Sequence, residues 1–443
     1  MTTGASSSAC ARCHLAAVAS VSSHRRVSPP RRRWADPRSS RVGARVPVAS
    51  SSGDGAPLEA WGRPGEYRRL GGSDLFVSDA FLSASAWSSS HDERDALEQL
   101  SVANDAGVNL VDLPPHDDDA RVSPDQRVGR WFRLAHKRRE DLLLAAAVDP
   151  LARRRAPPDT PRDAARSLAR DVESILIRAE LDHVDLVQLR WRTGHPDDAH
   201  DSCRLDPRDP HVEACLEALA RLVREGKARH VGVDHDDEWG ACEHRRLDRL
   251  ARLAQAPPIV AVRNARNLLA RGAFEEDLAR ACAPRVGGVG LLACAPLARG
   301  ALRGDERRGE AKSFSTVASG GGPRPANAAT ANANAKSSRS VEGIVDGFPE
   351  RVLFFNGGRE GTLAAAAAAA EVARAFGATP TELAYAFARS GGFAASVAVG
   401  GEDADRLRAN LDAFRADVPK ECVEEAVAAV ERVAAGTRTR EER

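Results

Sequence analysis

The chain has 443 residues, of which 42% are hydrophobic and 29% charged, a composition typical of a soluble globular protein. Its net charge of +1 is unevenly spread, because residues 1–53 contain nine arginines and one acidic residue, which leaves −7 on the remainder. We expect no nucleic-acid partner, since an acidic body lacks the basic face that phosphate contacts require, and no membrane span, since no apolar run approaches ~20 residues.

Residues 1–55 are rich in Ser, Arg and Ala and almost free of acidic side chains. This composition is typical of an organelle transit peptide, and the serine content favours a plastid over a mitochondrion. We therefore predict a chloroplast (stromal) protein, with a processing site in "VPVAS" near Ala49. The alternative is a disordered basic tail that carries no address. Cys10 and Cys13 form a "CARC" motif without a partner pair, which disfavours a zinc site, and the other six cysteines lack motif spacing and are interpreted as reduced thiols.

From Tyr67 onward, short apolar runs alternate with segments of helical period. The runs of strand length are "FVSDAFLSA", "VNLVDL", "DLLLAAAV", "VDLVQLR", "HVGV", "PIVAVR", "VGLLAC" and "ASVAVG". Continuous apolar runs suit strands that are buried on both faces of a parallel sheet. Of the helices between them, one begins with Thr160 as a candidate N-cap and Pro161 at the first helical position.

Eight strands, each followed by a helix, predict an α/β fold of the TIM (β/α)8 barrel type over residues 64–436, with an N-terminal hairpin and a C-terminal helix. A doubly wound sheet is disfavoured, because "SASAWSSS" after the first strand contains no GxGxxG motif. Residues 304–345 are a low-complexity stretch of Gly, Ala, Asn and Ser, interpreted as a disordered or mobile insertion within the barrel domain. Residues 437–443 are taken as a tail.

Several sequence blocks occur in an order that carries a resemblance. They are "YRRLGGSDLFVSD", "AGVNLVDL", "LDHVDLVQLRW", "VREGKARHVGVD", "VGLLACAPLARGALRG" and "TPTELAYAFARSGGFAASVAVGGEDADRLRANLDAF". With them, the chain resembles the aldo-keto reductases, in particular their longer plant and bacterial branch. The resemblance implies a barrel that transfers hydride between NADP(H) and a carbonyl compound. Family members use Tyr as the general acid, assisted by Lys and His, with an Asp that pairs with the Lys.

The catalytic positions that the resemblance implies are mostly replaced. Asp112 keeps the aspartate, whereas Asp117, preceded by His116, stands where the tyrosine is expected. Ala147 stands at the lysine position and Arg190 at the histidine position. A phenol with a pKa of about 10 donates a proton poorly at neutral pH without a nearby cation. The resemblance thus implies an impaired reductase.

A shift in alignment does not restore the missing pair. The chain has two tyrosines, Tyr67 in the predicted hairpin and Tyr385 in a predicted late helix. Its five lysines fall in predicted helices, loops or the insertion, and none falls at the end of a predicted strand. We therefore expect no Tyr–Lys couple inside the barrel.

The cofactor positions implied by the resemblance are also altered. The family's Ser-Asn pair is replaced by Asp234 and His235, its Gln by Arg263 and its stacking Tyr by Cys294. The family's basic position near the 2′-phosphate falls near Glu402, and Arg406 (or Arg408) offers a substitute cation. Gly400 and Asn410 are retained. Binding of NADP(H) is accordingly doubtful on sequence grounds.

Loops rich in His and Asp follow three of the predicted strands. Because they share one face of a barrel, a divalent metal site with Asp112, His116, Asp117 and His235 as ligands is one hypothesis. The favoured interpretation is solvated acidic loops, so no metal is assigned. A buried Arg190 needs a counter-charge, for which Asp112, Asp117 and Asp234 are candidates. It forms either a structural ion pair, which we favour, or a carboxylate or phosphate site.

Two functional hypotheses follow. The first, which we favour, is a pseudoenzyme: a catalytically silent barrel used for binding, regulation or assembly, with an unidentified small-molecule or protein partner. The second is a divergent NADP(H)-dependent oxidoreductase that acts on a small carbonyl compound, with Asp117 or His116 as proton donor. Titration with NADPH separates the two.

Overall fold

The computed structural model describes the chain in several ranges. These are residues 67–87, 92–115, 122–150, 160–190, 210–234, 249, 251–252, 255–271, 275, 278–282, 288–303 and 358–441. The predicted transit peptide and the predicted insertion at 304–345 lie outside the described residues.

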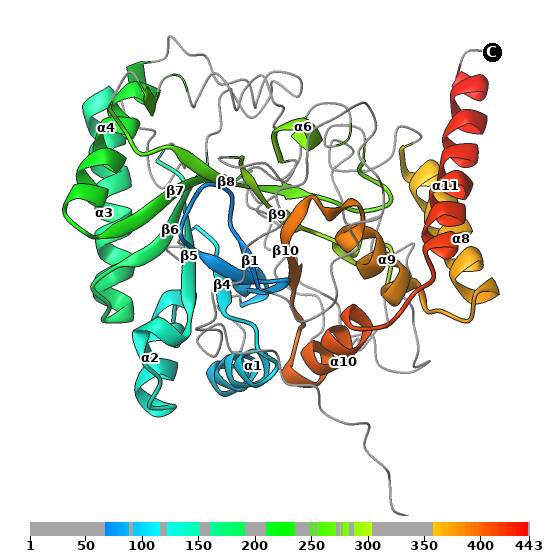
Figure 1. Cartoon of the computed structure of the whole chain (residues 1–443), viewed down its shortest axis with the longest axis horizontal. Coiled ribbons are helices and arrows are strands. Elements are labelled where there is room, and N and C mark those ends of the chain that lie inside the picture. Colours follow the sequence, from blue (N-terminus) through cyan, green and yellow to red (C-terminus); the bar gives the residue numbers. More distant parts are fainter. Residues whose placement is uncertain are drawn as a thin grey trace, which may run out of the picture. The chain divides into compact units, whose positions relative to one another are not determined.

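Eight parallel strands close into a barrel, which confirms the predicted TIM fold (Figure 1). Around the barrel the strand order is β10-β3-β4-β5-β6-β7-β8-β9, and β9 pairs with β10 to close the ring. The strands are β3 (Ala80–Ser83), β4 (Leu110–Leu113), β5 (Leu143–Val148), β6 (Val184–Leu189), β7 (Ala228–Asp234), β8 (Ile259–Ala265), β9 (Gly290–Cys294) and β10 (Ala394–Val399).

An antiparallel hairpin precedes the barrel and consists of β1 (Tyr67–Arg69) and β2 (Phe76–Ser78). The predicted single run "FVSDAFLSA" is therefore two strands, because the hairpin ends at Ser78 and the barrel begins at Ala80. Leu70, Leu75 and Val77 of the hairpin pack with inward-facing strand residues in one apolar cluster. The hairpin thus contributes to the apolar floor of the barrel interior.

The α-helices of the described ranges surround the strands (Figure 1). They are α1 (Glu93–Asp105), α2 (Pro124–Leu134), α3 (Pro161–Ala179), α4 (Pro210–Arg224), α6 (Ala279–Cys282), α8 (Gly358–Ala375), α9 (Pro380–Arg389), α10 (Ala404–Phe414) and α11 (Lys420–Glu441). The final helix therefore extends into residues predicted as a tail. Short 3-10 turns lie at Ala84–Ala86, Arg139–Asp141, Ala298–Gly300 and Ser390–Gly392.

Helix α3 shows how the sequence sets these elements. The Thr160 side chain accepts a hydrogen bond from the Asp163 backbone N–H, as its predicted N-cap role requires, and Pro161 occupies the first turn. Apolar residues at helical spacing, such as Leu168, Val172 and Leu176, are buried against the barrel. Of the helices in the described ranges, none is long and apolar enough to cross a membrane.

Side chains alternate along each strand between two hydrophobic clusters. Outward residues such as Val111 and Val187 join the large cluster between strands and helices, whereas Leu110, Leu186 and Ala261 join the interior cluster with the hairpin. Because the period along a strand is two, the next inward residue lies two positions on, nearer the carboxyl ends of the strands. Those positions carry the polar side chains of the candidate site.

Candidate functional site

Polar residues form one layer at the carboxyl ends of neighbouring strands. Asp112 of β4, Gln188 of β6 and Arg263 of β8 each lie two residues beyond an inward-facing apolar residue, and Asp234 ends β7. Arg190 lies one residue beyond the end of β6. We call these five residues, Asp112, Gln188, Arg190, Asp234 and Arg263, the mouth layer. Function in barrels of this type resides at this end of the strands.

Hydrogen bonds join the whole mouth layer. Arg263 bridges the two acids, with its Nε 2.9 Å from Asp112 Oδ2 and its Nη1 2.8 Å from Asp234 Oδ1. Gln188 Nε2 donates to Asp112 Oδ1 at 2.8 Å. Arg190 donates to Asp234 Oδ2 from Nε at 2.9 Å and from Nη2 at 2.5 Å. Every oxygen of the two carboxylates therefore accepts at least one hydrogen bond from within the layer.

The charges of the mouth layer balance, with two carboxylates against two guanidinium groups. All five residues are buried, and Asp112 and Asp234 are only 2% and 1% exposed. Burial raises the pKa of Asp112, which Arg263 and the Gln188 hydrogen bond oppose. Of the three counter-charges considered for Arg190, the structure pairs it with Asp234. The pairing with Asp234 supplies the counter-charge that a buried Arg190 needs.

Gln188 is a member of the mouth layer that sequence reasoning missed. Its Nε2 is paired with Asp112, but its buried Oε1 has no hydrogen-bond partner among the described residues. The signal was present in "VDLVQLR", where Gln188 follows the inward-facing Leu186 by two residues.

Ala147, at the position that the resemblance assigns to lysine, is buried in β5 and lies beside Gln188 in the strand register. Within the described ranges no lysine belongs to a strand. The hydroxyl of Tyr67 donates to the Gly107 carbonyl at 3.0 Å, and Tyr385 of α9 packs edge-on against Phe414 with ring centroids 5.7 Å apart. Neither phenol belongs to the barrel interior.

Three predicted site residues, His116, Asp117 and His235, lie outside the described residues. They are three of the four ligands of the hypothetical metal site. Among the residues that are described, no group of three or more His, Cys, Asp or Glu side chains is arranged to hold a metal ion. The remaining hypothetical ligand, Asp112, is engaged by Arg263 and Gln188.

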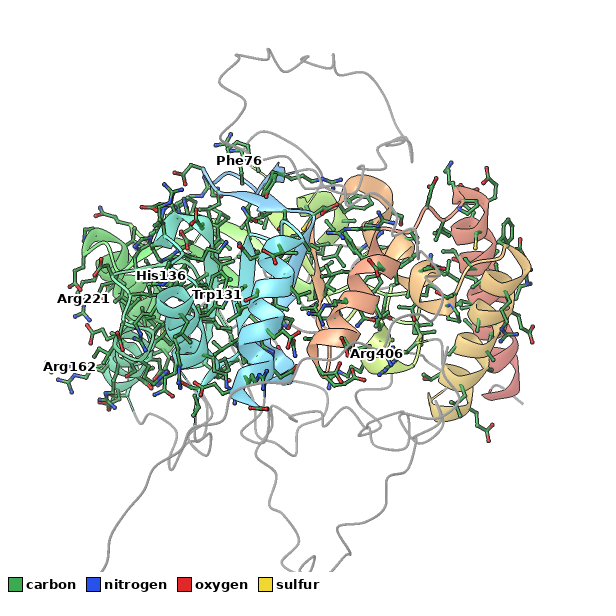
Figure 2. The ribbon with its side chains drawn as sticks, turned by 90° about the horizontal axis from the view of Figure 1, so that it is seen from below. Phe76, Trp131, His136, Arg162, Arg221 and Arg406 are labelled. Atoms are coloured by element: carbon green, nitrogen blue, oxygen red, sulfur yellow. The ribbon has the colours of Figure 1, made fainter. Side chains whose placement is uncertain are left out.

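The residues predicted for the phosphate end of the cofactor surround the start of α10. Glu402 accepts from Arg303 Nη2 at 2.9 Å and lies 3.4 Å from Arg406 Nε. Asn410 Nδ2 donates to the Gly400 carbonyl at 2.6 Å, which ties α10 to the end of β10. Figure 2 shows Arg406 and Phe76 of the hairpin on opposite sides of the barrel domain. The acid that replaces a basic residue here is thus already paired with both arginines.

Cys294 ends β9 and is 3% exposed, and its carbonyl accepts a hydrogen bond from the Arg266 backbone N–H at 3.1 Å. It lies beside Ala265 in the register. The cysteines of the described ranges, Cys215, Cys282, Cys294 and Cys422, are all buried. A small buried thiol offers none of the stacking area of an aromatic ring.

Comparisons with known proteins agree with this architecture. Residues 82–431 match the model of the Aldo/keto reductase family. The chain is 28% identical over 373 residues to Protein tas of Escherichia coli strain K12, covering 81% of this chain and 96% of that protein. It is 28% identical over 247 residues to Uncharacterized oxidoreductase YrpG of Bacillus subtilis strain 168, covering 54% and 68%. It is 33% identical over 148 residues to an Aldo-keto reductase of Babesia bovis, covering 31% and 51%.

Proposed function

The chain belongs to the aldo/keto reductase family of oxidoreductases, and from this premise we propose that it is a pseudoenzyme in which hydride transfer is impaired and the barrel serves as a binding or regulatory protein. The mouth layer is the observation that carries the proposal. Its two carboxylates are each bonded to arginine where the family carries out its reaction, and the layer contains no phenol, imidazole or ammonium group that could act as a general acid.

Proton donation is the first step that fails. A catalytic phenol needs a neighbouring cation to stabilise its anion, because its ordinary pKa is about 10. Here burial raises the pKa of Tyr385 further, and its ring packs against Phe414 outside the barrel interior. Asp112, which keeps the aspartate of the family's catalytic set, pairs with Arg263 rather than with a lysine.

The residues present do not fit NADP(H), the cofactor type used by the family. At the nicotinamide end, the Asp234 carboxylate accepts from Arg190 and Arg263 and, unlike the family's Ser-Asn pair, has no hydrogen to donate to a carboxamide oxygen. At the phosphate end, Glu402 would repel a 2′-phosphate and already engages Arg303 and Arg406.

Titration of the full chain with NADPH, followed by cofactor fluorescence, tests the proposal. We expect no saturation up to millimolar concentration and no turnover with a panel of small aldehydes and ketones. A dissociation constant below ~10 μM, about −7 kcal/mol, would overturn the proposal. If turnover accompanied such binding and disappeared in His116→Gln or Asp117→Asn, the protein would be a divergent reductase with a new proton donor.

We also propose that the protein is imported into chloroplasts. The support is the composition of residues 1–55, which is rich in Ser and Arg and nearly free of acid. A fusion of these residues to a fluorescent protein should accumulate in plastids and be shortened on import. Retention of the fusion in the cytosol would refute the address without bearing on the barrel.

A further inference from the structure

The mouth layer is exposed unevenly. The side chains of Asp112 and Asp234 are 2% and 1% exposed, whereas those of Arg263 and Arg190 are 9% and 10% exposed. Most of the surface that this layer leaves accessible therefore belongs to its two cationic side chains, with the carboxylates beneath. A molecule that reaches the mouth layer meets hydrogen-bond donors and positive charge, since guanidinium groups cannot accept hydrogen bonds.

The two arginines converge on a single carboxylate. Arg190 reaches Oδ2 of Asp234 with Nε and Nη2, and Arg263 reaches Oδ1 with Nη1 at 2.8 Å. Two guanidinium groups around one planar carboxylate form a clamp of the kind that recognises carboxylates with charge-assisted hydrogen bonds. Asp234 is the internal occupant of this clamp.

We propose that the mouth layer is a binding site for a small carboxylate ligand, whose carboxylate takes over the hydrogen bonds that Arg190 gives to Asp234. Asp234 stays compensated during the exchange, because Arg263 continues to hold its other oxygen. The ligand is small, because the arginine side chains are only about a tenth exposed. This inference rests on the proposed function, in which the barrel binds a ligand without transferring hydride.

A carboxylate fits the clamp better than the other candidate classes do. A neutral carbonyl compound would replace a charge-assisted hydrogen bond by a weaker one, and a cation would be repelled. Phosphate shares the negative charge, but it is tetrahedral, whereas the group that the arginines already hold is planar. Phosphate is therefore the comparison that tests the assignment to carboxylates.

Binding of an anion should also be linked to a proton. The mouth layer is neutral as a set, so an added carboxylate leaves one unbalanced negative charge. The charged groups that act on Asp112 are Arg263, Asp234 and Arg190, and burial raises its pKa. Asp112 is thus the acid in the layer best placed to take up the proton. Affinity for a carboxylate should increase as the pH falls from 8 to 6, where simple carboxylates remain ionised.

The experiment measures thermal stability and binding heat of the full chain with acetate, acetamide, inorganic phosphate and sodium chloride at matched ionic strength. We expect acetate to stabilise the protein saturably, and acetamide and chloride to have no such effect. Asp234→Asn removes the internal competitor and should bind acetate at least about tenfold more tightly, which is ~1.4 kcal/mol. Arg190→Met should lose binding. Arg130→Met, an exposed arginine of α2, is the matched control and should bind as the wild type does.

Three outcomes would overturn the inference: equal effects of acetate and acetamide, tighter binding of phosphate than of acetate, or no gain in Asp234→Asn. The gain in Asp234→Asn keeps the test decisive even if Arg190→Met folds poorly, because an unfolded variant cannot gain affinity. Failure here, together with the absence of NADPH binding, removes the carboxylate site and leaves the proposed function standing. NADPH binding with turnover removes the proposed function whatever acetate does.

Discussion

Replacement of Arg263 by methionine is the perturbation that best measures the mouth layer. The substitution keeps much of the side-chain volume but removes the cation that joins Asp112, at 2.9 Å, to Asp234, at 2.8 Å. Asp234 would keep Arg190, whereas Asp112 would keep only the Gln188 hydrogen bond. Breaking a buried ion pair from one side typically costs about 3–5 kcal/mol, because the remaining charge stays buried without compensation.

Protonation of Asp112 limits that cost. Holding a carboxyl with an ordinary pKa of 3.8 in its neutral form at pH 7 costs about 1.36 kcal/mol for each pH unit, or ~4.4 kcal/mol in all. We therefore expect Arg263→Met to lower the free energy of unfolding by about 3–4 kcal/mol at pH 7. The loss should shrink by up to ~1.4 kcal/mol per unit as the pH is lowered towards 4, since protons then neutralise the orphaned acid.

Urea denaturation followed by tryptophan fluorescence is the assay, because Trp87 and Trp131 are buried in the folded barrel. Adding Asp112→Asn to the Arg263→Met variant should restore part of the lost stability, since it removes the orphaned charge. The control is Arg130→Met, whose ion pair with Glu93 is exposed and should contribute less than about 1 kcal/mol. A loss below ~1 kcal/mol in Arg263→Met, or one independent of pH, would refute the reasoning.

Two further predictions concern the scaffold. Gly129→Ala should destabilise the protein by about 1–3 kcal/mol in the same urea assay, because a methyl group on α2 would lie 2.1 Å from the Ala179 carbonyl oxygen of α3. Gly436→Ala is the control and should not destabilise the protein, because a methyl group added there would meet no neighbouring atom within 4 Å. Asp74, whose pKa is lowered chiefly by its hydrogen bond with His230, should stabilise the fold above pH ~4 and lose that contribution as the pH falls through its folded-state pKa. Asp74→Asn should flatten this acid limb of the stability profile, and an unchanged limb would contradict the assignment.

The barrel could be predicted from the sequence because its strands are buried on both faces and appear as uninterrupted apolar runs between helical segments. "DLLLAAAV" and "VDLVQLR" correspond to β5 and β6 within one or two residues. The boundary between β2 and β3 could not be predicted in the same way. Apolar residues lie on both sides of Asp79, so the sequence reads as one run. The two strands differ only in their partners, because β2 pairs antiparallel with β1 and β3 pairs parallel with β10.

The candidate site could be predicted by position but not by pairing. The resemblance selected Asp112, Arg190, Asp234 and Arg263 independently, from different strands, and the structure joins them in one hydrogen-bonded layer. Three acids were equal candidates for Arg190, because a sequence does not reveal where a long side chain ends. Gln188 was missed since a neutral amide in an apolar strand gives no charge signal.

The pairing offers a reason why Asp112 persists beside an alanine. If the position of Ala147 once held a lysine, as the resemblance implies, its loss alone would have left a buried carboxylate without compensation, at a cost of several kcal/mol. Arg263 supplies the missing positive charge by donating a hydrogen bond to Asp112. Its second hydrogen bond goes to Asp234, which also accepts from Arg190. The four charges then form a set in which each acid depends on a base contributed by another strand. Restoring a lysine at Ala147 without removing Arg263 would therefore add a positive charge beside an acid that already has its counter-charge, and we expect Ala147→Lys to destabilise the barrel rather than to restore a reductase.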